Sequence, residues 1–155
     1  MARLAWIASL ATLLAVTATL AACGGDKTED NRYIRELTAA QTRFQTNQRR
    51  LEADAKRSSS ARENRRALDR FAGSISDTIS ALRRIDVPAK VRAEHSRFVA
   101  VFVTWHDDVT RFVAAVKSST PSSFARARRR IAAATATFNR SSREAASDID
   151  AKLAG

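Results

Sequence analysis

Apolar side chains recur along most of the chain at alternating steps of three and four residues, which places them on one face of an α-helix. The pattern predicts four helices, over residues 30–56, 60–87, 88–116 and 121–153. The third has the clearest apolar row, and the fourth has polar side chains at two core positions. The rows consist of Tyr33, Leu37, Ala40, Phe44, Asn47 and Leu51; Leu68, Phe71, Ile75, Ile79, Leu82 and Ile85; Val91, His95, Phe98, Phe102, Trp105, Val109, Phe112 and Val116; and Phe124, Ile131, Thr135, Phe138, Ser142, Ala145 and Ile149.

The predicted helix boundaries rest on capping residues and on the two prolines. Ser60 with Glu63 matches a capping box, which indicates that the second helix starts there. A proline disfavours α geometry in the residue before it, so the second helix should end before Pro88. Pro88 itself suits the first turn of the third helix, and Thr120-Pro121 reads as an N-cap followed by a first-turn proline.

Residues that break regular structure are scarce. The chain of 155 residues has two prolines and four glycines, too few for the many turns of a β-sandwich or barrel. Four helices joined by short turns are typical of a bundle in which each helix reverses direction. The sequence therefore predicts an all-α, antiparallel up-down-up-down four-helix bundle.

The N-terminal segment differs from the rest. Arg3 precedes an almost wholly apolar run over residues 4–22, and small residues then lead to Cys23. This order is that of a secretory signal. Two alternatives are a transmembrane helix, which needs ~20 apolar residues, and an ordinary signal in which Cys23 has no special role. All three interpretations place the chain after Cys23 outside the cytoplasm.

The tetrapeptide Leu20-Ala21-Ala22-Cys23 resembles the lipobox of bacterial lipoproteins. The resemblance implies that Leu20, Ala21 and Ala22 are the cleavage-recognition residues, and that the Cys23 thiol receives a diacylglycerol group. Acyl chains contribute ~0.8 kcal/mol per buried methylene, so the protein would stay on the extracytoplasmic face of the cell membrane. The implied division is residues 1–22 as signal peptide, 23–29 as lipidated cysteine and tether, and 30–155 as the bundle.

A second resemblance lies in the middle of the chain. Residues 82–87, followed by Pro88 and by His95, are similar to a segment of uncharacterised bacterial lipoproteins with helical domains. It implies a bundle and a lipid anchor and brings no known activity. Because Cys23 is the sole cysteine, an intrachain disulfide is excluded and the fold must be held by its core.

The formal net charge of the chain is +11, and the basic residues are unevenly placed. In the predicted topology, the first and third connections lie at the end of the bundle farthest from Cys23. This basic pole suits an anionic wall polymer or an acidic envelope protein. Nucleic acid is disfavoured because no aromatic side chains interleave with the arginines. The alternative is a solvated surface shaped by coding bias. The arginines are Arg49, Arg50, Arg57, Arg62, Arg65, Arg66, Arg126, Arg128, Arg129 and Arg130.

Motifs for catalysis or metal binding are lacking. His95 and His106, the two histidines, are eleven residues apart on one helix, or about 16 Å, too far to share one metal. Neither a Gly-x-Ser-x-Gly elbow nor a Cys-x-x-Cys-His haem motif occurs. The carboxylates of Asp107-Asp108 do not face each other, and Asp107 can pair with Arg111. We expect His95 to be a buried, neutral core residue, and we predict no enzyme, metal or cofactor.

These observations favour a membrane-anchored, extracytoplasmic lipoprotein that serves as a non-catalytic interaction module of the cell envelope. An alternative function is a carrier or sensor that binds a small apolar ligand or haem in the bundle core. This alternative is based on the aromatic row Phe98, Phe102, Trp105 and Phe112. A row at helical spacing is, however, also typical of an ordinary hydrophobic core. A third alternative is a spacer that assembles with copies of itself.

Overall fold

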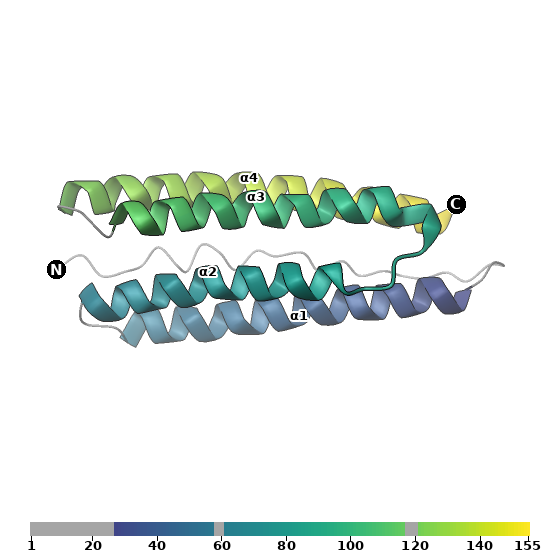
Figure 1. Cartoon of the computed structure of the whole chain (residues 1–155), viewed down its shortest axis with the longest axis horizontal. Coiled ribbons are helices and arrows are strands. Elements are labelled where there is room, and N and C mark those ends of the chain that lie inside the picture. The colour runs from purple at the N-terminus through teal and green to yellow at the C-terminus, as the bar shows by residue number, and fades with distance from the viewer. Residues whose placement is uncertain (1–26, 58–60, 117–120) are drawn as a thin grey trace.

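The computed structural model describes residues 27–57, 61–116 and 121–155, and nearly all of them are helical. The four helices run antiparallel, as Figure 1 shows, so the predicted up-down-up-down four-helix bundle is confirmed. Consecutive helices pack side by side, α3 and α4 most closely of all. The helices are α1 (Lys27–Arg57), α2 (Ala61–Arg83), α3 (Arg92–Val116) and α4 (Pro121–Ala154), with the 3-10 turn η2 (Ala89–Val91) before α3.

The bundle has two unlike ends. The end of α1 lies beside the start of α2, and the end of α3 lies beside the start of α4, both at the left of Figure 1. We call this half of the bundle the distal end. The start of α1 and the end of α4 lie at the other half, which we call the terminal end. The distal end comprises residues 45–57, 61–74, 106–116 and 121–137, and the terminal end comprises 27–44, 75–105 and 138–155.

The second helix ends before Pro88, as predicted, but it ends earlier than expected, and the predicted place of Pro88 was wrong. α2 ends at Arg83, and Pro88 precedes the turn η2 instead of lying in the first turn of α3. Pro88 has φ −53° and ψ 140°, an extended polyproline geometry that an α-helix cannot contain. The last turn of α2 tightens as the N–H of Arg84 donates to the Ala81 carbonyl at 3.2 Å. Such short-range bonds satisfy carbonyls at a helix end.

The other boundaries agree more closely with the sequence. Pro121 is the first residue of α4, as predicted, where its missing N–H costs nothing. α1 starts at Lys27, three residues earlier than predicted, which brings Glu29 and Asp30 into its first turn. Carboxylates there interact favourably with the positive end of the helix dipole. Ser60 and Thr120, the two predicted cap residues, lie outside the described residues.

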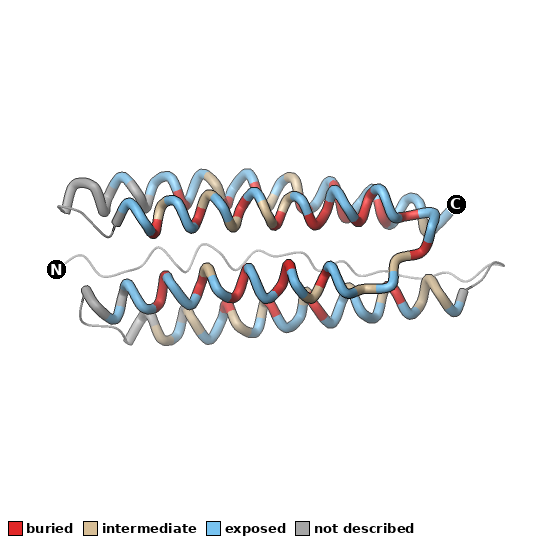
Figure 2. The backbone as a smooth tube through the Cα atoms, viewed as in Figure 1, coloured by how far each residue is buried: buried red, intermediate tan, exposed pale blue. Residues whose placement is uncertain are grey.

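The core follows the predicted rows, with a displacement on α1. Figure 2 shows the buried positions facing inward along all four helices, and Thr135 and Ser142 are buried as expected. On α1, however, Gln48 is buried and Asn47 is only half-buried. A straight helix has 3.6 residues per turn, so its buried face drifts away from a strict seven-residue pattern. The amide Nε2 of Gln48 donates to Ser74 Oγ at 3.3 Å, which offsets part of its desolvation.

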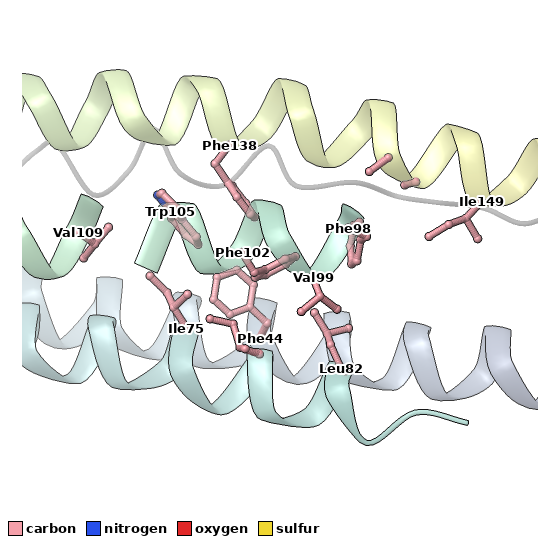
Figure 3. Packing of buried hydrophobic residues seen from close by; sticks show 14 of the residues in the cluster. Phe44, Ile75, Leu82, Phe98, Val99, Phe102, Trp105, Val109, Phe138 and Ile149 are labelled. Atoms are coloured by element: carbon pink, nitrogen blue, oxygen red, sulfur yellow. The ribbon is translucent and has the colours of Figure 1, made fainter. Parts of the chain in front are cut away.

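Aromatic rings of α1, α3 and α4 meet at the middle of the bundle (Figure 3), and a ring of α2 also contacts this group. The ring centroid of Trp105 on α3 lies 5.8 Å from Phe44 on α1, 5.5 Å from Phe71 on α2 and 4.0 Å from Phe138 on α4. Edge-to-face and offset-stacked pairs at these distances are favourable beyond the area they bury. The aromatic row of α3 therefore packs against rings of the other helices, as a core does. Its last member, Phe112, is only half-buried.

Candidate functional site

The distal end carries the arginines predicted to form a basic pole. Helix reversal brings the end of α1 and the starts of α2 and α4 together there (Figure 1). Arg57, Arg62 and Arg128 also lie in helices at this end, but their side chains are outside the described residues. We call the seven exposed members the distal arginines. They are Arg49, Arg50, Arg65, Arg66, Arg126, Arg129 and Arg130.

The distal arginines have no carboxylate partners in the described part of the chain. An ion pair that joins two helices at this end is formed instead by Arg70 and Asp54 at 4.0 Å. α4 adds four arginines and no acid over residues 121–137, and it is the only one of the four helices without an acid in its first turn. The distal end has thirteen basic and six acidic residues in all.

Charges at the terminal end are nearer to balance, with twelve basic and nine acidic residues. Ion pairs there join helices or their connections to one another. Lys90 lies 2.7 Å from Asp30 on α1, Arg97 on α3 lies 3.5 Å from Asp148 on α4, and Arg32 pairs with Asp86. Cations at this end thus have roles within the fold that the distal arginines do not have.

His95 is a buried core residue bonded on both ring nitrogens. Its Nε2 lies 3.1 Å from the carbonyl of Leu82, in the last turn of α2, and its Nδ1 lies 3.1 Å from the hydroxyl of Tyr33 on α1. Because a carbonyl can only accept, Nε2 carries the proton and Nδ1 accepts from Tyr33. Burial lowers the pKa of His95, against an opposing effect of the Leu82 bond. The predicted burial of His95 against neighbouring helices is confirmed.

The sequence did not reveal Tyr33 as the partner of His95. Tyr33 is fully buried, and burial raises the pKa of its phenol, with smaller contributions from the nearby carboxylates of Asp150 and Glu94. Burial likewise raises the pKa of Asp150. A tyrosine among aliphatic core positions is a signal that its hydroxyl has a partner inside the fold. Tyr33, Leu82 and His95 therefore join three helices at the terminal end.

The remaining candidates for metal or acid-base chemistry are dispersed. His106 is half-buried, with its Nδ1 3.6 Å from Asp107. Arg111 pairs with Asp108 at 3.4 Å, so the predicted pairing with Asp107 was wrong by one residue. An interval of three residues brings helical side chains together as well as an interval of four does. Within the described ranges, no three His, Cys, Asp or Glu residues gather closely enough to hold a metal ion.

A groove between α3 and α4 was not anticipated from the sequence. It has a volume of about 430 Å³ and is lined by both helices along the middle of the bundle. Trp105 and Phe138 lie at its base, stacked at an interplanar angle of 15°. Small side chains such as Ala100 and Thr137 line it as well. The groove depends on small residues of two helices being opposite each other, which periodicity alone does not predict.

The anchor motif, Leu20-Ala21-Ala22-Cys23, lies outside the described residues. None of the helices in the described part of the chain has the length and apolar character needed to cross a membrane. Comparisons of the chain with protein families, with characterised proteins and with solved structures found no significant match.

Proposed function

We propose that the protein is a lipid-anchored, extracytoplasmic interaction module of the cell envelope, and that its distal end binds an anionic partner. The observation that carries the proposal is the group of seven exposed arginines without carboxylate partners in the described structure. Unpaired guanidinium groups remain available to an external ligand. Their planar donor forks match phosphate and carboxylate groups, which they bind through two parallel hydrogen bonds.

The start of α1 and the distal arginines lie at opposite ends of the bundle. The chain enters the bundle at the start of α1, at the terminal end. α1 has 31 residues, which makes it about 46 Å long. A lipid on Cys23 would hold the terminal end near the bilayer, whereas headgroup charge is screened within ~8 Å at physiological salt. An upright bundle would therefore direct the distal arginines to partners beyond the membrane surface.

A phosphate-rich wall polymer fits this surface best, and an acidic envelope protein offers the same chemistry. Phosphates along a polymer can engage several arginines at once, so individually weak contacts add up. Single-stranded nucleic acid is less suited, because such binders supply aromatic platforms for the bases. Among the described residues, no exposed aromatic side chain accompanies the distal arginines.

Cosedimentation of the protein with cell-wall material at low and high salt tests the proposal. We expect binding at low salt that weakens as salt increases, since screening shortens the range of the charges. Reversal of Arg126, Arg128, Arg129 and Arg130 to Glu should abolish binding. The matched control reverses four arginines of the terminal end, Arg35, Arg83, Arg84 and Arg143. Equal binding by both variants would refute the role of the distal arginines.

The lipid anchor has its own test. Growth of the bacterial host with a labelled fatty acid should label the protein, and Cys23→Ser should remove the label because serine cannot form the thioether. A protein that stays unlabelled would refute the anchor and leave the distal binding test unaffected.

A carrier of a small apolar ligand is the second candidate function. The aromatic row of α3 does not favour a ligand or haem inside the core, because Phe102 and Trp105 pack against Phe44 and Phe138. The groove between α3 and α4 is the observation that supports this candidate, since its volume of about 430 Å³ falls in the usual range for small-molecule sites.

A further inference from the structure

The groove between α3 and α4 has the dimensions of a site for a long, narrow molecule. Along α3 it extends from Arg97 to Asp108, an interval of eleven residues or about 16 Å. Both of its walls have small side chains, which keep the two helices from closing it. These residues are Ala100 and Thr104 on α3, and Ala134, Thr137 and Ser141 on α4.

The base of the groove is apolar but has one unused hydrogen-bond donor. Trp105 is 2% exposed and stacks on Phe138. Its indole Nε1 is buried and has no hydrogen-bond partner in the described structure. Nearly all buried polar atoms of folded proteins have a partner, and an orphaned one needs an explanation. The two stacked rings nevertheless give the groove an apolar base.

The groove is acidic although the chain has a net charge of +11. Its charged lining residues are Asp108, Glu144 and Asp148, with Arg97 as the sole cation. Arg97 is engaged by Glu94 at 3.2 Å and by Asp148 at 3.5 Å, and Asp108 pairs with Arg111 at 3.4 Å. Glu144 is exposed and has no ion pair in the described structure. A cationic group would be attracted here and an anionic one repelled.

From this apolar base and acidic rim we infer that the groove binds an amphipathic organic cation. The apolar body lies on Trp105 and Phe138, and the cationic group lies beside Glu144. This inference gives a ligand class to the carrier candidate and rests on that candidate, but it is independent of the distal arginines. The occupant is defined by charge complementarity, since a fatty acid of the same length would place its carboxylate against the acidic rim.

Binding can be followed through Trp105 in the full-length chain. The other tryptophan is Trp6, so Trp6→Phe leaves Trp105 as the only indole emitter. The probes are dodecyltrimethylammonium, dodecyl maltoside and dodecanoate, each titrated below its micelle concentration. Their tails match while their head groups are cationic, neutral and anionic. We expect the cation to bind about tenfold more tightly than dodecanoate at low salt, as several weak charge contacts combined would produce.

Two variants locate the site and identify its charge. Ala100→Leu fills the groove from an exposed position and should weaken binding of the cation about tenfold. Glu144→Gln should weaken binding of the cation about threefold and leave binding of the maltoside unchanged. Ala93→Leu on α3 and Glu36→Gln on α1 are the controls, because both residues are exposed and lie outside the groove.

The outcomes separate this inference from the carrier candidate. Equal affinity for all three head groups, lost in Ala100→Leu, would overturn the cation assignment and leave the carrier candidate standing. Binding that Ala100→Leu does not change, or no binding at all, would overturn both. Circular dichroism of each variant shows whether the bundle is intact.

Discussion

The two ends of the bundle are built from the same four helices but use their polar residues differently. At the terminal end, Tyr33 and His95 bond to each other inside the core, and ion pairs such as Lys90 with Asp30 join neighbouring segments. At the distal end, the described arginine side chains of the basic pole face solvent without carboxylate partners. The terminal end thus uses polar groups to fix the fold, whereas the distal end leaves its charges for an external ligand.

A single helix illustrates the contrast. Tyr33, in the second turn of α1, is fully buried with its hydroxyl bonded to His95. Arg49 and Arg50, four turns later on the same helix, are exposed and form no ion pair with a described residue. Substitutions at the terminal end should therefore change stability, and substitutions of the distal arginines should change binding. The predictions below test this division, beginning with the largest expected effect.

The largest difference should come from two phenylalanines of α3. Phe98 at the terminal end is 1% exposed, whereas Phe112 at the distal end is half-buried. We expect Phe98→Ala to lower the free energy of unfolding by about 3–5 kcal/mol, because it leaves a cavity in the core. Phe112→Ala should cost less than about 2 kcal/mol, since fewer of its contacts are buried. Urea denaturation measures both, and equal costs would contradict the contrast.

Loss of one hydroxyl should have opposite effects at the two ends. Tyr33→Phe removes the donor to His95 Nδ1 and should cost about 1–3 kcal/mol, because a buried acceptor loses its partner. Thr135 at the distal end has a buried Oγ1 without a partner in the described structure. Thr135→Val should therefore be neutral or stabilising. If Thr135→Val were destabilising and Tyr33→Phe neutral, the proposed contrast between the two ends would be contradicted.

Stability should depend on pH through the terminal end. Burial lowers the pKa of His95 in the folded protein, so below about pH 6.5 the unfolded chain binds a proton that the folded chain does not. The free energy of unfolding should then fall as pH decreases, by up to about 1.4 kcal/mol per pH unit. His95→Gln should remove this component, measured as urea midpoints between pH 5 and 7. An unchanged slope in this variant would exclude His95 as the cause.

Two other groups extend this pH profile. The pKa of Tyr33 is raised, so above about pH 10 the unfolded chain loses a proton that the folded chain keeps, and stability should fall there too. The pKa of Asp150 is also raised, so its carboxyl favours folding most when it is protonated at low pH. Its contribution to stability therefore opposes that of His95 as pH decreases.

The smallest effect on stability should come from the distal arginines themselves. Changing Arg126, Arg129 and Arg130 to Gln should shift the free energy of unfolding by no more than about 0.5 kcal/mol, because these side chains are exposed and have no ion pair among the described residues. Asp30→Asn breaks the pair with Lys90 at the terminal end and should cost about 0.2–1 kcal/mol. Thermal denaturation of the triple arginine variant and of Asp30→Asn measures both effects. A strongly destabilised triple variant would contradict the prediction.

Much of the fold could be predicted because each helix buries one apolar row, and such rows are visible in the sequence. The up-down-up-down order alone then predicted that the arginine-bearing ends of α1, α2 and α4 lie at the same end of the bundle. The path around Pro88 could not be predicted, since a residue in polyproline geometry can lie either before a helix or within a longer connection. Gln48 was missed because the buried face drifts along a straight helix.

The candidate sites were less accessible to sequence reasoning. The bond between Tyr33 and His95 joins residues 62 positions apart, and it requires the register between α1 and α3. The groove requires the register between α3 and α4, because Ala100 and Ser141 line it from opposite walls. Helical periodicity places a residue on a face, but it does not say which residues of the neighbouring helix lie opposite.

The most direct test of the central claim is the affinity for purified polyphosphate, measured by calorimetry at several salt concentrations. The two variants to compare carry the same net charge. One has Arg126, Arg128, Arg129 and Arg130 reversed to Glu, and the other has Arg35, Arg83, Arg84 and Arg143 reversed. We predict that the distal variant loses both affinity and salt dependence, while the terminal variant retains most of each. Equal losses in the two variants would show that net charge alone governs binding, and would contradict the account.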